Sequence, residues 1–68
     1  MKNNADNASR SLLTPGQAAE QLKIPVSTLS RWRSERRELP YVTVGRLIRY
    51  RQVDIDRWID DNTVNPVE

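Results

Sequence analysis

The sequence predicts a small, mainly α-helical domain of three helices with a β-hairpin before the last helix. Three observations predict this fold class. A complete helix-start signal stands at Thr14-Pro15, and Pro25 interrupts the helical pattern shortly afterwards. Two short runs of β-branched and aromatic residues then flank Gly45-Arg46. With 68 residues, the chain is long enough for one domain with one modest core.

The first helix has an unusually full set of start signals. Thr14 can cap the helix, Pro15 occupies the first helical position without losing a hydrogen bond, and Gln17 can bond back to the cap. Leu13 precedes the cap and can pack onto Ala18 as a hydrophobic staple. We expect this helix to run from Pro15 to about Leu22, and to bury Ala18, Ala19 and Leu22.

A turn and a second helix follow at once, because Pro25 disfavours a continuous helix through Ile24. Ser27 is the natural cap of a helix from Thr28 to about Arg36. Helical spacing places Leu29 and Trp32 on one face, with the outward face formed by Ser27, Ser30, Arg31 and Ser34. Small side chains around one long donor suit a helix that enters the major groove of DNA. The alternative is an ordinary surface helix that carries serines.

The hairpin is expected to join residues 41–44 and 47–50 through a two-residue loop that starts with Gly45. Its strand alternation predicts an inner face of Val42, Val44, Ile48 and Tyr50, and an outer face of Thr43, Arg49 and Arg51. Arg46 would then lie at the tip, where it can reach a phosphate or the minor groove. The alternative is a stabilising hairpin whose tip faces only water.

The last helix is expected from about Gln52 to Asp61, with an apolar stripe of Ile55, Trp58 and Ile59 that closes the core. We expect Trp32 and Trp58 to pack in the core, since each falls on its helix's apolar stripe. The acidic residues Asp54, Asp56, Asp60 and Asp61 should face water rather than hold a metal. The expected domain is residues 11–61, flanked by flexible tails at 1–10 and 62–68.

Charge and composition limit the possible functions. Residues 23–51 contain eight basic and two acidic residues, so a strongly basic middle lies within a chain of net charge +2. Such a block indicates a phosphate-binding face, although a solvated surface is the alternative. The chain has no cysteine and no histidine, which excludes thiolate or imidazole metal sites and His-based catalysis. We therefore expect no enzyme, cofactor, metal or membrane span, and a cytoplasmic protein associated with the bacterial nucleoid.

The chain resembles the excisionase family of small winged helix-turn-helix proteins, which is related to the MerR-type DNA-binding domain. The resemblance covers residues 12 to 60 and is carried, in order, by LTPGQAA (13–19), IPVSTLSRW (24–32), LP (39–40), VGR (44–46), IRY (48–50) and DIDRWI (54–59). Lys23 departs from the pattern, because helix-turn-helix turns often have glycine there. No stretch resembles the long dimerising helix of full MerR regulators, so we do not expect a ligand-sensing regulator.

The resemblance implies that the second helix reads double-stranded DNA, and that the hairpin is a wing on the neighbouring backbone or minor groove. The expected DNA-binding residues are Ser27, Thr28, Ser30, Arg31, Arg33 and Ser34 on the helix, and Arg36, Arg37, Gly45, Arg46 and Arg49 on the wing and at phosphates. It further implies a mobile-element protein that bends DNA and assists an integrase in excision. Because a monomer this small should bind a single site weakly, we also expect cooperative binding at repeated sites. A regulator of phage or element promoters and a protein-interaction adaptor with a basic face are the alternatives.

Overall fold

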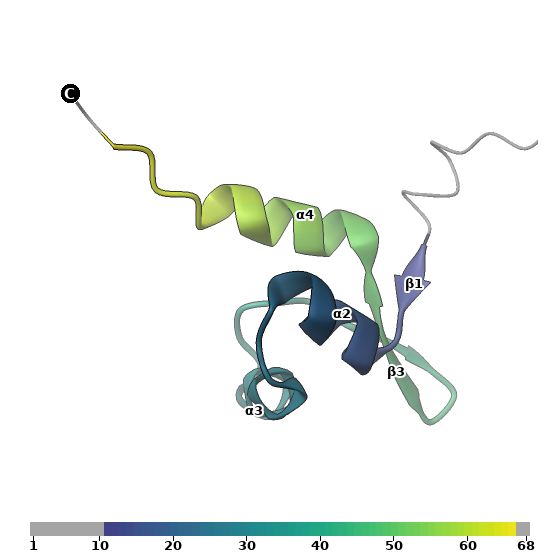
Figure 1. Cartoon of the computed structure of the whole chain (residues 1–68). Coiled ribbons are helices and arrows are strands. Elements are labelled where there is room, and N and C mark those ends of the chain that lie inside the picture. The colour runs from purple at the N-terminus through teal and green to yellow at the C-terminus, as the bar shows by residue number, and fades with distance from the viewer. Residues whose placement is uncertain (1–10, 67–68) are drawn as a thin grey trace, which may run out of the picture.

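A computed structural model describes residues 11–66 and shows a winged helix-turn-helix (Figure 1). In chain order the elements are β1 (Leu12–Leu13), α2 (Pro15–Leu22), α3 (Val26–Glu35), β2 (Val42–Val44), β3 (Leu47–Arg51) and α4 (Gln52–Asp61). The predicted fold class is confirmed, and so are the bounds of the first and last helices. The expected tail at 1–10 and the last two residues lie outside the described part of the chain.

Helix α2 begins as its start signals predict. The Thr14 side chain accepts a hydrogen bond from the Gln17 amide at 3.1 Å, and the Gln17 side chain accepts one from the Thr14 amide at 2.9 Å. The helix ends at Lys23, which adopts the left-handed conformation with φ 59°. Glycine is the usual residue for that conformation. The turn therefore forms with lysine in place of glycine, at a modest cost in backbone energy.

Helix α3 begins two residues earlier than expected, and Ser27 is not its cap. Pro25 holds the cap position in an extended conformation, with φ −65° and ψ 146°, and its carbonyl accepts from the Thr28 amide. Proline fixes a φ that suits this position, so the helix starts directly after it. Ser27 therefore lies inside the first turn, and the helix ends at Glu35 with Arg36 in the left-handed conformation.

The sheet contains a third strand that sequence reasoning missed. Its order is β1-β3-β2, with both pairs antiparallel, so the strand that precedes α4 lies in the centre. Strand β1 is only two residues long, yet it pairs Leu13 with Tyr50, and the Ser11 carbonyl accepts from the Gln52 amide next to it. The start of the described chain is thereby tied to the junction of β3 and α4.

The predicted inner face of the hairpin is wrong. The two-residue loop aligns Val44 with Leu47, Thr43 with Ile48 and Val42 with Arg49. Residues directly opposite each other in an antiparallel pair project to the same side of the sheet. The valines therefore share a face with Leu47 and Arg49 rather than with Ile48 and Tyr50, and Val44 and Leu47 are exposed.

The core lies between α2, α3, β3 and α4. Its buried residues are Ala18, Ala19, Leu29, Leu39, Tyr50 and Ile55, and Leu13, Leu22, Ile24, Trp32, Ile48 and Trp58 pack around them. Trp32 and Trp58 pack against each other, as predicted for core residues, with ring centroids 5.6 Å apart.

Two expectations for α4 fail. Asp54 is buried rather than outward, because its carboxylate accepts two hydrogen bonds from the Arg51 guanidinium at 2.6 and 2.9 Å. Ile59 is 41% exposed, so the apolar stripe closes the core mainly through Ile55 and Trp58. Residues 62–66 continue without regular structure.

Candidate nucleic-acid interface

The outer face of α3 presents the residues that the helical spacing predicts. Ser27, Ser30, Arg31 and Ser34 are all exposed, whereas Leu29 on the opposite face is 1% exposed. Thr28 is half-buried at the edge of this face. Since the serines are short, a partner could approach this face of the helix closely, with the Arg31 side chain as its long hydrogen-bond donor.

The hairpin tip is formed by Gly45 and Arg46, both exposed. Gly45 has φ +64°, which glycine adopts without strain and which the first position of a tight hairpin turn requires. Val44 and Leu47 beside the tip are 46% and 53% exposed. The wing therefore offers one cation flanked by apolar side chains.

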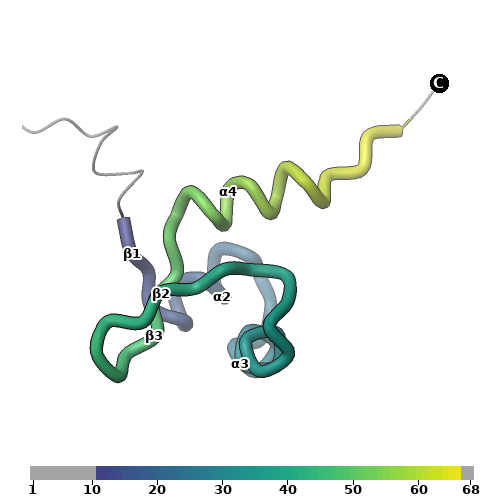
Figure 2. The backbone as a smooth tube through the Cα atoms, turned by 180° about the vertical axis from the view of Figure 1, so that it is seen from behind, coloured from purple at the N-terminus to yellow at the C-terminus, as the bar shows by residue number. Residues whose placement is uncertain are grey.

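Helix α3 and the wing reach the same side of the molecule. In both views the hairpin tip and α3 lie at the bottom, and α4 lies at the top (Figures 1 and 2). The acidic residues Asp56, Asp60 and Asp61 are exposed on α4. The basic elements and the acidic helix are thus separated across the fold.

The basic side chains fall into two groups according to their partners. Lys23 pairs with Glu20 at 2.9 Å, Arg37 pairs with both Glu35 and Glu38, and Arg51 pairs with Asp54. Among residues 11–66, six arginines have no carboxylate partner, namely Arg31, Arg33, Arg36, Arg46, Arg49 and Arg57. All of these except Arg57 lie on α3, at its end or on the wing. Uncompensated positive charge is therefore concentrated on the side that α3 and the wing share.

The compensated arginines are held as strongly charged groups. The hydrogen bond to Glu35 raises the pKa of Arg37, with a further contribution from Glu38. In the same way the hydrogen bond to Asp54 raises the pKa of Arg51. Because an added anion must compete with carboxylates already in place, these two side chains are less available to an anion than Arg31 or Arg46.

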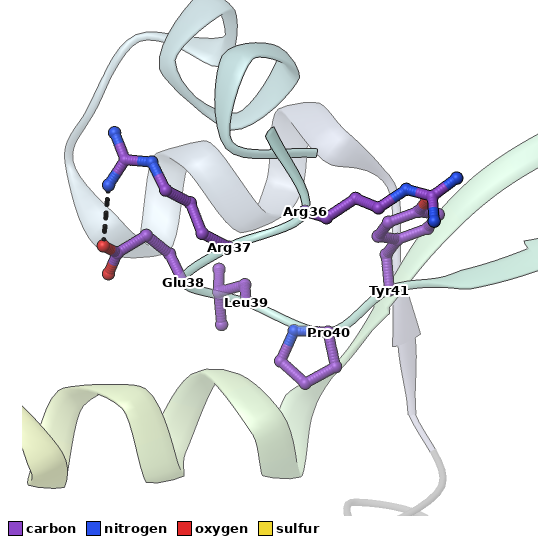
Figure 3. A pocket seen from close by; sticks show the side chains of 6 residues that line it. All are labelled: Arg36, Arg37, Glu38, Leu39, Pro40 and Tyr41. Carbon is purple, nitrogen blue, oxygen red and sulfur yellow. Dashed lines mark hydrogen bonds and ion pairs between the residues drawn. The ribbon is translucent and has the colours of Figure 1, made fainter. Parts of the chain in front are cut away.

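The segment that joins α3 to the wing forms an open hollow lined by Arg36, Arg37, Glu38, Leu39, Pro40 and Tyr41. Figure 3 shows the Arg36 side chain on the same side as Tyr41, while Arg37 and Glu38 pair at the other end. Glu38 has a left-handed backbone with φ 77°, and its carboxylate accepts from Arg37 and, at 3.0 Å, from the Trp58 indole. Leu39 anchors the segment in the core. These contacts fix the spacing between helix and wing.

Two of the expected interface arginines are tethered within the fold. Arg33 is half-buried and donates a hydrogen bond to the Tyr50 phenol at 3.0 Å. Arg49 is half-buried and donates to the Ile48 carbonyl at 2.7 Å. Sequence reasoning missed Tyr50 as a partner of Arg33. No periodic signal marks this pairing, because it joins α3 to β3, two segments that are separate along the chain.

Membrane spans and metal sites are two further features to consider in the described part of the chain. Residues 11–66 contain no helix that is long and apolar enough to cross a membrane. The same residues contain no group of three or more Asp, Glu, His or Cys side chains placed to hold a metal ion.

Comparison with known proteins gave one informative result. Residues 12–63 match a family model described as a helix-turn-helix domain, which covers both helices of the motif, the wing and α4. A search of curated proteins gave no significant match.

Proposed function

The chain belongs to the helix-turn-helix domain family, a family of DNA-binding domains, and on that premise we propose that it recognises a specific sequence in double-stranded DNA. In this proposal α3 enters the major groove, and the wing contacts the adjacent backbone or minor groove. The protein acts as a non-enzymatic factor, and the absence of histidine and cysteine from the chain supports that role.

One observation carries the proposal: five of the six arginines without carboxylate partners among residues 11–66 belong to α3, its end or the wing, which face the same side, whereas the exposed acidic residues of α4 lie away from them. A duplex carries a phosphate charge on both strands, so a continuous cationic side fits it and an acidic side does not. The short serine side chains of α3 would let the helix approach the base edges closely. A surface that only faces water has no need of such short side chains.

We assign Arg31 to base readout, because it projects from the serine-lined face and can bond the O6 and N7 atoms of guanine. Ser27, Thr28, Ser30 and Ser34 surround it at the groove. We assign Arg33, Arg36, Arg46 and Arg49 to backbone phosphates, with Gly45 allowing the wing to turn tightly. Arg37 also belongs to the expected set, but its two glutamate partners make its contribution the smallest.

For the biological role we propose an excision factor of a mobile element, which binds and bends DNA near a recombination site and assists an integrase. The resemblance of residues 12 to 60 to the excisionase family supports this role. Such a factor acts on nucleoid DNA in the cytoplasm, and its small footprint favours cooperative binding of several copies. Regulation of a phage or element promoter is the second candidate, because it requires the same helix and wing.

The exposed wing also supports an alternative from another class. Strand β2 is at the edge of the sheet, and its last residue, Val44, is exposed together with Leu47 of β3. An adaptor could add a partner's strand to this edge and bind acidic side chains with its arginines.

In vitro selection from a random duplex pool at about physiological salt tests the proposal, since non-specific phosphate binding is weakened there. We expect enrichment of a short motif. Direct repeats of the motif are expected for a cooperative excision factor, and an inverted repeat for an operator-binding regulator. A pool that stays random after selection would refute sequence-specific recognition and favour the adaptor.

A further inference from the structure

The hydrogen bond between Arg33 and Tyr50 joins α3 to the central strand β3. Arg33 lies in the last turns of α3, and Tyr50 lies in β3, the central strand that continues into the wing. The Arg33 Nη1 donates to the phenol oxygen of Tyr50 at 3.0 Å in a partly buried setting. Tyr50 itself is 1% exposed, so its oxygen is held in place by the core.

Arg33 differs from the other arginines that are fixed by side chains. Arg37 and Arg51 are held by carboxylates, which balance their charge. Arg33 is half-buried and is held by a neutral phenol, and residues 11–66 supply no carboxylate to it. Removing a cation from water without a counter-charge is unfavourable, whereas an anionic ligand at the same place would compensate it.

The location suits a phosphate. When one element of a protein enters the major groove and another reaches the neighbouring groove, the sugar-phosphate strand between the two grooves passes across the gap between those elements. The Arg33 and Tyr50 side chains meet between α3 and the central strand β3. A guanidinium has five N–H donors in a planar fork, so one bond to Tyr50 leaves donors for a bidentate phosphate contact.

We propose that Arg33 and Tyr50 form a phosphate subsite between helix and wing, in which Arg33 binds a backbone phosphate and Tyr50 is a positioning residue that fixes the guanidinium. The subsite rests on the proposed DNA binding. Its ligand is a phosphate diester of the duplex backbone, so it adds affinity for every sequence alike. Tyr50 contributes by restricting a flexible side chain before binding, which lowers the entropy lost on association.

The test uses the full chain and four variants, measured by fluorescence anisotropy with a random-sequence duplex and with the duplex that selection enriches. Arg33→Met removes the charge and keeps an apolar stem. Tyr50→Phe keeps the aromatic ring and removes the oxygen. The third variant combines both substitutions. Arg57→Met is the matched control, because Arg57 has the same charge and also lacks a carboxylate partner among residues 11–66, but lies on α4.

Arg33→Met is expected to reduce the magnitude of the slope of log K against log salt by about 1 on both duplexes, and Arg57→Met to leave it unchanged. Tyr50→Phe is expected to weaken binding roughly three- to tenfold on both duplexes, as for loss of one hydrogen bond. The double variant should bind as Arg33→Met does, because the phenol acts only through Arg33. A merely structural link would lower the melting temperature but would not change the salt slope.

The subsite is refuted if Arg33→Met keeps the full slope, or if the two substitutions weaken binding additively. In either case, retained sequence preference in the unmodified chain would show that DNA recognition stands without the subsite. If the unmodified chain binds no duplex, both the subsite and the proposed function fail. Melting curves of all variants identify any loss of fold. If Arg33→Met does not fold, the affinity of Tyr50→Phe for both duplexes tests the positioning role on its own.

Discussion

The salt dependence of binding should reveal which arginines reach the DNA. In the proposed interface four arginines contact phosphates, Arg33, Arg36, Arg46 and Arg49. Each neutralised phosphate contributes about 0.9 to the slope of log K against log salt, so a slope of about −3.6 is expected. Between 50 and 200 mM salt the affinity for random duplex should therefore fall by about 150-fold.

A different count follows if the compensated cations also bind phosphates. Adding Lys23, Arg37 and Arg51 gives seven contacts, a slope of about −6.3 and a fall of about 6,000-fold over the same range. The two cases differ by more than an order of magnitude. The salt slope therefore tests whether the ion pairs with Glu20, Glu35, Glu38 and Asp54 keep these cations from binding phosphates.

Two single variants refine the measurement. Arg46→Ala at the wing tip should reduce the slope to about −2.7, whereas Arg37→Ala should leave it near −3.6. Anisotropy titrations with a labelled random duplex at five or more salt concentrations measure both. The hypothesis that only cations without a carboxylate partner bind phosphates would be refuted by either of two results. One is an equal reduction of the slope by Arg37→Ala and Arg46→Ala, and the other is a slope near −6 in the unmodified chain.

Four further substitutions test specificity and stability. Arg31→Ala should cost about 1–3 kcal/mol on the preferred sequence and relax specificity; competition titrations that found equal losses on target and random duplex would contradict its assignment to base readout. Thr14→Ala should remove the cap of α2 and lower the free energy of unfolding by about 1 kcal/mol, or about 4–8 °C in melting temperature. Leu29→Ala should cost about 2–5 kcal/mol, because Leu29 is 1% exposed in the core. Leu47→Thr, at a 53% exposed position, should change the free energy of unfolding by about 0.5 kcal/mol at most, and urea titration that ranked Leu47→Thr as the more damaging would contradict the observed burial.

Local rules predicted the helices well and the sheet less well. The bounds of α2 follow from Thr14, Pro15 and Gln17, because a cap and its partner are neighbours along the chain. Strand β1 escaped prediction because two residues carry no alternation, and their pairing with Arg51 and Tyr50 is a long-range contact. The start of α3 was misjudged because Ser27 is the better side-chain cap, yet Pro25 supplies the required backbone angles.

The face of the hairpin could have been predicted from its loop length. A two-residue loop at Gly45-Arg46 fixes the register, and the register decides that Val44 lies opposite Leu47. Apolar character suggested that the valines face inward, but their register with Leu47 and Arg49 places them on the other side. Asp54 was misplaced for a related reason, since its burial depends on the bidentate bond from Arg51 in the preceding strand.

The sequence predicted the exposed positions of the candidate site more reliably than the hydrogen-bond and ion-pair partners of its arginines. Helical periodicity correctly placed Ser27, Ser30, Arg31 and Ser34 on the outer face of α3. The sequence could not distinguish a free arginine from a compensated one. Each ion-paired cation has its carboxylate within three residues along the chain, yet Arg33 and Arg36 have Glu35 equally near and do not pair with it.

The separation of the acidic helix α4 from the arginines of α3 and the wing also affects how fast the molecule finds a duplex. A small domain with opposite charges at its two ends has an electric dipole, and the field of DNA turns a dipole before contact is made. The approaching protein is thus oriented with α3 and the wing forward, so a larger fraction of encounters is productive. The association rate constant should fall steeply as salt rises. Removal of the exposed acidic side chains of α4, which lie far from the proposed contact, should lower the orienting torque without removing any contact to DNA.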